Sequence, residues 1–247
     1  MFWHLLSTCG YFPNYRPLAA PTVALPPLSY AIARCNINDP HVQRCIADLL
    51  IHPQLDINLR TPIFGVHVLH FATAHHNPDL LTWLASFIPG GLAVAGKTAL
   101  GHTSLHIAYL PLTAGQTDAG VDNVTTSIHC VRTLDWGWAP YDLHSPIFAQ
   151  FKTPHELGLL WAKPMTEAQN KAQRVTIELL LRWGGCDVSA QDMDRNTALH
   201  YLAGTLGIDE LTVRVVRELK GGEDVWKKAK NIWGLTPSDL WIGGGGR

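Results

Sequence analysis

The sequence predicts an all-α chain made of short helices joined by tight turns. Apolar residues recur at helical spacing, as with Val42, Ile46 and Leu49. A short polar residue directly before proline, as in Asn77-Pro78, is typical of a helix start. Paired glycines after an apolar run, as in Gly184-Gly185, are typical of a helix end. The remaining elements follow from the same signals.

The stretch from Leu179 to Ala203 contains the clearest local pattern. Its glycine pair is followed by Asp192 and Asp194, whose short carboxylates can accept hydrogen bonds from nearby backbone N–H groups in a turn. Thr197 then suits a helix cap, and Leu199 opens a new apolar helix face. The stretch therefore predicts a helix end, a turn and the start of the next helix.

This stretch resembles the junction between two ankyrin repeats, whose pattern runs LLLxxGADVNAxDxxGxTPLHxAA. The resemblance implies an ankyrin-repeat solenoid of about five or six helix-turn-helix repeats with insertions. It also implies that His200 bonds the backbone and a threonine across the turn, which is a structural role. The residues that depart from the pattern are Cys186, Ser189, Arg195, Ala198 and Leu202.

Further units of the same kind are expected on both sides of this junction. The other repeat starts are Pro27–Ala33, Gly65–Ala72, Gly101–Ala108 and Asn231–Leu240. The second helices of the units are expected at His41–Leu50, from Pro78 onward, at Thr166–Trp183 and at Asp209–Leu219. In one repeat start, His67 stands where the pattern has threonine.

The region from Tyr109 to about Glu167 contains no clean repeat and permits two interpretations. It can be a single insertion, or it can contain a degraded repeat with a weak start at Ser145–Ala149. We prefer the degraded repeat, in which Ile147 provides an anchor between Leu105 and Leu199. A capping-box pattern at Thr153–Glu156 predicts an added helix, or a later start for that repeat.

The domain boundaries follow from composition. Residues 1–26 combine prolines with aromatic residues, so we expect an arm or short helix that caps the first unit. The ankyrin-repeat domain is expected over residues 27–242, and residues 243–247 are expected to form a flexible glycine-rich tail.

Composition and charge exclude several classes of protein. The net charge is −1, which gives no electrostatic case for binding nucleic acid or an anionic membrane. No apolar run is long enough for a membrane span, and the N-terminus makes a poor signal peptide. Five irregularly spaced cysteines favour neither a disulfide framework nor a zinc site. We therefore expect a cytoplasmic or nuclear protein that is not secreted.

Two sequence signals for ligands are weak. The chain has 13 histidines, but no group of them completes a ligand set, so we expect no metal and no cofactor. Gly91–Thr98 fits the phosphate-loop pattern GxxxxGK[ST], which requires a preceding strand and a following helix. Because a helical stretch precedes it and a turn follows it, we interpret it as another repeat junction.

An aromatic and acidic stretch lies inside the irregular region. Aromatic rings can shape a small-molecule pocket, while histidine and aspartate can transfer protons. The alternative is that the two tryptophans only seal a loop. Under the enzyme interpretation, the catalytic residues are His129, Asp135 and His144, and the pocket residues are Trp136, Trp138 and Tyr141.

The ankyrin resemblance implies that a partner binds the concave face, which comprises the turn tips and the inner helices. The tips are unusually apolar here, so either other segments cover them or they bind something apolar. The predicted binding residues at the tips are Phe64, Val66, His102, Met193, Asp194, Asn196 and Trp233. We expect a protein partner and no catalysis; the alternative is a cyclase- or isomerase-type enzyme, or a carrier, with an apolar small-molecule pocket.

Overall fold

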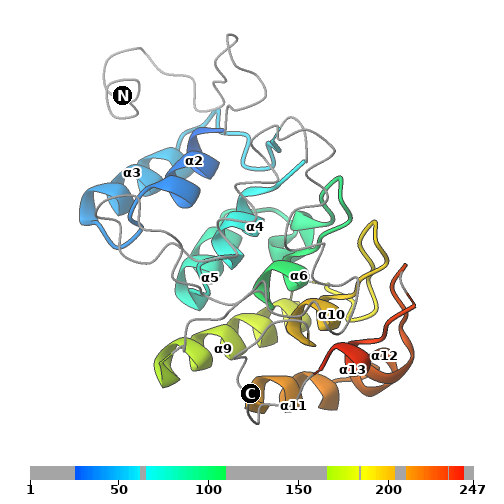
Figure 1. The fold of residues 1–247 in the computed structure, drawn as a ribbon. Coiled ribbons are helices and arrows are strands. Elements are labelled where there is room, and N and C mark those ends of the chain that lie inside the picture. Colours follow the sequence, from blue (N-terminus) through cyan, green and yellow to red (C-terminus); the bar gives the residue numbers. More distant parts are fainter. Residues whose placement is uncertain are drawn as a thin grey trace.

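The computed structural model describes residues 26–61, 65–109, 166–183, 185–203, 210–232 and 234–241. Every regular element within these ranges is a helix, which confirms the all-α prediction (Figure 1). Residues 1–25 of the predicted arm and all of the predicted tail lie outside the described residues.

The helices form two layers. The first layer comprises α2 (Pro27–Arg34), α4 (Val68–Thr73), α6 (Ser104–Ala108), α10 (Ala198–Ala203) and α13 (Pro237–Leu240). Each helix of this layer contacts the next one in this order. The second layer comprises α3 (Pro40–Leu50), α5 (Pro78–Ser86), α9 (Glu167–Trp183) and α11 (Glu210–Glu218). In it, α3, α5 and α9 pack against α2, α4 and α6 respectively.

The contacts of α6 correct our preferred interpretation of the irregular region. α6 contacts α10 directly, and the side chain of Gln173 in α9 donates a 3.0 Å hydrogen bond to the carbonyl of Ala108 at the end of α6. No first-layer helix therefore lies between α6 and α10, so a degraded repeat is not stacked between these two helices. Residues 110–165, including Ile147, lie outside the described residues.

Helix starts follow the predicted caps. The side chain of Asn77 accepts a 3.0 Å bond from the N–H of Leu80, ahead of α5. The hydroxyl of Thr166 accepts a 3.3 Å bond from the N–H of Gln169 and so caps α9. The buried residues of α9 are Gln173, Thr176, Ile177 and Leu180.

Two short elements were not predicted. Gly91–Ala95 forms the 3-10 helix η1, and Gly222–Lys228 forms α12, which contacts α10, α11 and α13. The paired glycines before α12 had indicated only the end of the preceding helix. Gly221 lies in the left-handed region at φ 82° and leads directly into α12. Two exposed ion pairs span successive turns of α12, from Glu223 to Lys227 and from Asp224 to Lys228.

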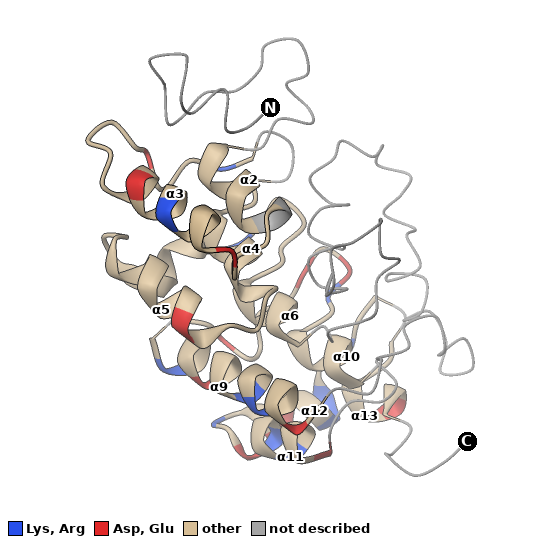
Figure 2. Cartoon of the chain, turned by 90° about the vertical axis from the view of Figure 1, so that its left-hand side faces the viewer, with Lys and Arg blue, Asp and Glu red and all other residues tan. Residues whose placement is uncertain are grey.

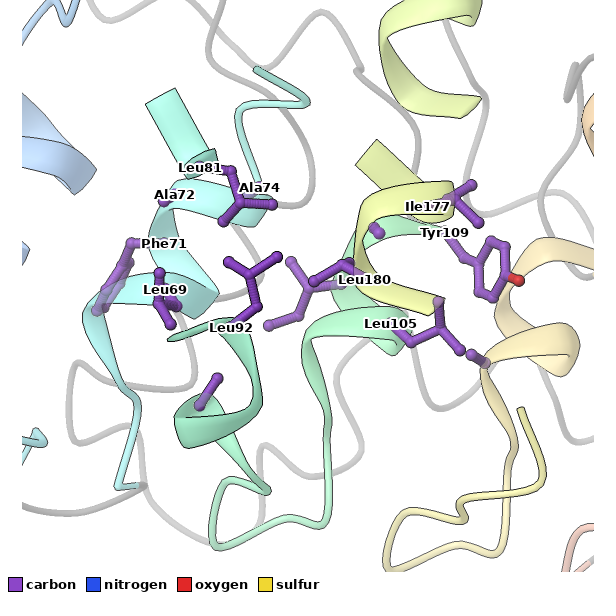
Figure 3. Packing of buried hydrophobic residues seen from close by; sticks show 14 of the residues in the cluster. Leu69, Phe71, Ala72, Ala74, Leu81, Leu92, Leu105, Tyr109, Ile177 and Leu180 are labelled. Atoms are coloured by element: carbon purple, nitrogen blue, oxygen red, sulfur yellow. The ribbon is translucent and has the colours of Figure 1, made fainter. Parts of the chain in front are cut away.

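The core lies between the two layers. Leu105 of α6 and Leu180 of α9 are fully buried, and Leu92 of η1 packs in the same cluster (Figure 3). Because α9 contacts α5, α6 and η1, its apolar side chains join two neighbouring units into one core.

Charged side chains lie mainly on the second layer and in the turns (Figure 2). Helices α4, α6 and α10 contain no Lys, Arg, Asp or Glu, and all of their side chains are buried. These three inner helices therefore offer no open surface, whereas the turns before α10 and α13 carry the exposed side chains of Met193 and Ile232.

Replacement of Leu199 by alanine should lower the free energy of unfolding by about 2–5 kcal/mol, because the side chain is fully buried between neighbouring units. Denaturant melts would measure this loss. The matched control is Leu211→Ala in α11, where the partly exposed side chain should cost less than about 1 kcal/mol. A loss under about 1 kcal/mol at Leu199 would contradict its place in the core.

Candidate functional site

Three stacked turns precede α6, α10 and α13, and we call them the tip row. The first is closed by a bridge between Lys97 and Thr103, and the second by an equivalent bridge between Gln191 and Thr197. In the third, which spans residues 231–235, the N–H of Asn231 donates to the carbonyl of Leu235. The three turns therefore share one backbone plan.

Backbone hydrogen bonds join each turn of the tip row to the next. The N–H of Met193 donates to the carbonyl of Leu100 at 3.0 Å, and the N–H of Ile232 donates to the carbonyl of Asp194 at 3.0 Å. Gly101 lies at φ +82°, and a Cβ added there would meet the Cα of Asp192 at 2.8 Å. The stacking therefore requires glycine at this position, because the next turn lies directly against it.

Histidines link the turns to the helices that follow. Nδ1 of His106 accepts bonds from the backbone N–H and the hydroxyl of Thr103, and its Nε2 donates to the carbonyl of Asn196 at 3.1 Å in the next unit. His200 repeats this arrangement with Thr197 and with the carbonyl of Leu235. The predicted structural role of His200 is confirmed.

The unit that contains α4 varies the same design. His67 replaces threonine as the cap of α4, and its Nδ1 accepts a 3.2 Å bond from the N–H of Leu69. Nδ1 of His70 accepts from the N–H of His67 at 3.0 Å. The Gly96 backbone approaches the His70 ring, but no described residue lies within hydrogen-bond distance of its Nε2.

Burial keeps these imidazoles neutral. Desolvation, with a smaller contribution from neighbouring histidines, lowers the pKa of His70 and of His106 to about 3. Desolvation also lowers the pKa of His67 and of His200 to about 4. The neutral ring is required, because one nitrogen must accept a bond while the other donates one.

A buried polar cluster, here called the polar junction, lies between the second and first turns of the tip row. The Tyr201 hydroxyl donates to Oδ2 of Asp192 at 2.6 Å and accepts from Nε2 of His102 at 2.9 Å. Oδ1 of Asp192 also accepts from the N–H groups of Asp194 and Asn196. Hydrogen bonds from these groups hold the pKa of Asp192 below its usual value, although burial opposes the shift.

The polar junction combines an acid, a phenol and an imidazole, but it is closed to solvent. Asp192, Tyr201 and His102 are all buried, and His106 packs edge-on against the Tyr201 ring. A substrate could not reach these groups without separating two units. We therefore interpret the junction as structural.

The predicted binding residues at the tips divide into two groups. Met193 is 62% exposed and Asp194 is partly buried, so both reach the surface. Val66, His102 and Asn196 are buried, and this part of the prediction was wrong about their exposure. In the first two turns, the residue after the left-handed position, Gly101 or Arg195, is buried between units, where His102 bonds Tyr201 and Asn196 bonds Asn231.

The remaining predicted site residues lie outside the described residues. They are His129, Asp135, Trp136, Trp138, Tyr141, His144, Phe64 and Trp233. Ile232, which the ankyrin resemblance also places at a tip, is 50% exposed on the third turn. It follows Asn231 as Met193 follows Asp192.

The phosphate-loop match adopts another structure. Gly91–Ala95 is a 3-10 helix, and the turn toward Gly101 follows instead of a helix. The ammonium of Lys97 donates to the carbonyl of Gln191 at 3.1 Å, and the hydroxyl of Thr98 accepts from the N–H of His102. Both side chains that would contact a nucleotide are thus used within the tip row.

Other ligand signals are absent from the part of the chain that the structure describes. No group of three or more metal-ligating side chains occurs there. Cys35, Cys45 and Cys186 form no disulfide among the described residues, and burial raises the pKa of Cys186 to about 11. A groove of about 680 Å³ lies between α3 and α5, beside Trp83 and Leu80.

Replacement of Tyr201 by phenylalanine should cost about 1–3 kcal/mol of unfolding free energy, because it removes a donor from the buried Asp192 and an acceptor from His102. Denaturant melts would measure the loss. The matched control is Tyr109→Phe, because the Tyr109 hydroxyl is equally buried but has no hydrogen-bond partner among the described residues. That change should stay within about 0.5 kcal/mol. Equal losses would show that the junction contributes nothing specific.

Replacement of His106 by glutamine should reduce the pH dependence of stability. The unfolded imidazole takes up a proton near pH 6.5, whereas the folded one does so only near pH 3. Its contribution is therefore complete above pH 6.5 and is lost as pH falls toward 3. Between pH 4 and 6 the slope should fall by about 1.4 kcal/mol per pH unit in chemical melts. Leu105→Ala should lower stability and keep the slope; an unchanged slope in the glutamine variant would contradict the burial argument.

No helix among the described residues combines the length and apolar character needed to cross a membrane. No protein-family model matches the sequence, and the comparison with curated proteins finds no significant match. The function of this chain must therefore be inferred from its own contacts.

Proposed function

We propose that this chain is a divergent ankyrin-repeat solenoid that binds a protein partner through its tip row. The repeat assignment is supported by the recurring order of turn, histidine-capped helix and second-layer helix. The hydrogen bonds of His106 and His200 to the following unit support it as well. Each first-layer helix also contacts its successor, as expected of stacked repeats.

One observation carries the binding proposal. Met193 and Ile232 are exposed apolar residues at the same position of neighbouring turns. The Ile232 N–H donates to the carbonyl of Asp194, the residue directly after Met193. The backbone segments that carry the Met193 and Ile232 side chains are therefore adjacent. An exposed apolar pair on a rigid ladder of backbone bonds is suited to accept an apolar side chain of a partner.

The proposal places binding on the turns rather than on the helices of the first layer. Every side chain of α4, α6 and α10 is buried, so these helices contribute no contact surface. The enzyme alternative depends on His129, Asp135 and His144, and no observation on the described residues favours it.

Photo-crosslinking would test the proposal. Benzoylphenylalanine at position 193 or 232 of the full chain should capture one protein from cell extract, whereas the same group at the exposed Glu178 of α9 should not. Unlabelled wild-type chain should compete for the capture. A chain carrying Met193→Asp and Ile232→Asp should compete at least about tenfold less well.

Two results would oppose this assignment. Equal capture from positions 193 and 178 would show nonspecific contact, and undiminished competition by the double-aspartate chain would place the binding surface elsewhere. Both replaced side chains are exposed, so the double variant should keep its melting temperature.

A further inference from the structure

Arg195 occupies a backbone position that the other turns of the tip row give to glycine. Its φ is 60°, in the left-handed region, while Gly101 and Gly234 at the equivalent places have φ of 82° and 78°. An L-residue with a long side chain is disfavoured there, because its Cβ crowds the backbone. The chain therefore carries a local conformational cost at this turn that glycine would avoid.

No described contact of the Arg195 side chain offsets that cost. The side chain is exposed, and its guanidinium makes no hydrogen bond or ion pair with any residue that the structure describes. By contrast, Arg60 places its guanidinium on the carbonyls of Gly65, Val94 and Ala95, and Arg217 forms a bidentate pair with Glu223. A strained residue without an internal role suggests a role toward a partner.

The charges around the apolar pair also favour one kind of partner. Arg195 follows Asp194, whose carbonyl accepts the bond from Ile232, so the backbone of this exposed arginine adjoins that of the exposed apolar pair. Lys230, two residues before Ile232, is exposed as well. Lys97 and Asp194 already interact within the chain, and the Lys97 ammonium donates a hydrogen bond to the Gln191 carbonyl. Among the described residues of 191–196 and 230–235, the exposed side chains are thus two apolar groups and two cations.

We propose that the tip row recognises an acidic protein segment. A large apolar side chain of that segment packs on Met193 and Ile232, and an Asp or Glu carboxylate pairs with the planar guanidinium of Arg195 through two parallel hydrogen bonds. Lys230 adds long-range attraction that raises the association rate. This inference rests on the proposed binding through the tip row and adds the chemistry of the partner.

A random dodecapeptide phage library selected on the immobilised full chain would test the inference. We expect enriched peptides with one large apolar residue flanked by Asp or Glu. A synthetic copy of the most enriched peptide, measured by fluorescence anisotropy, should bind Arg195→Gly about tenfold more weakly than wild type, with a smaller loss for Arg195→Lys. Arg214→Gln, which removes an exposed cation from α11, is the matched control and should not change the affinity.

The same variant has an opposite effect on stability. Because glycine relieves the left-handed backbone, Arg195→Gly should raise the melting temperature by about 2–4 °C while it weakens peptide binding. A merely structural role for Arg195 would move both quantities in the same direction.

The outcomes separate the two proposals. Peptides that lose binding with Met193→Asp and Ile232→Asp, but are neutral or basic and insensitive to Arg195→Gly, would overturn the acidic partner and keep the tip row as a binding surface. Peptides insensitive to all of these changes, or no enriched peptide at all, would overturn both.

Discussion

The bond from a histidine Nε2 to a carbonyl of the following unit is the contact on which the order of the units depends. In His106 and His200 the same ring also accepts the N–H that opens its own helix, so cap and junction form together. A protonated ring would lose its acceptor, and burial therefore has to keep the ring neutral. The polar junction around Asp192 adds further hydrogen bonds between the unit of α6 and the unit of α10.

Much of this arrangement could be predicted from local sequence. Asn77-Pro78 and Thr236-Pro237 begin helices where predicted, because capping depends only on a few neighbouring residues. Burial of His102 and Asn196 could not be predicted, since it depends on Tyr201 and Asn231 of other units. The buried face of α9 likewise depends on which elements the helix contacts, and these include η1.

The direct contact between α6 and α10 could not be predicted from the spacing of apolar residues. Ile147 fits a leucine-type position in the sequence, yet α6 and α10 already meet through His106 and Asn196. The tip row shows the opposite case. Met193 could be predicted as an exposed apolar tip because the turn pattern repeats at Ile232. That no described residue pairs with the Arg195 side chain could not be predicted, because it depends on which residues the fold brings near the guanidinium.

The packing of α9 on α6 has a consequence for how the chain reaches this fold. These two helices are in contact, but residues 110–165 lie between them in the sequence. Of the contacts α2–α3, α4–α5 and α6–α9, theirs therefore joins the residues that are farthest apart in the chain. The entropy cost of closing such a loop grows only slowly with its length. Residues 26–109 and 166–241 thus resemble two short arrays joined by an interface rather than by a short connection. A chain cut within the insertion would retain every described contact of that interface, and reassembly of two fragments would depend on their concentration instead of on chain continuity.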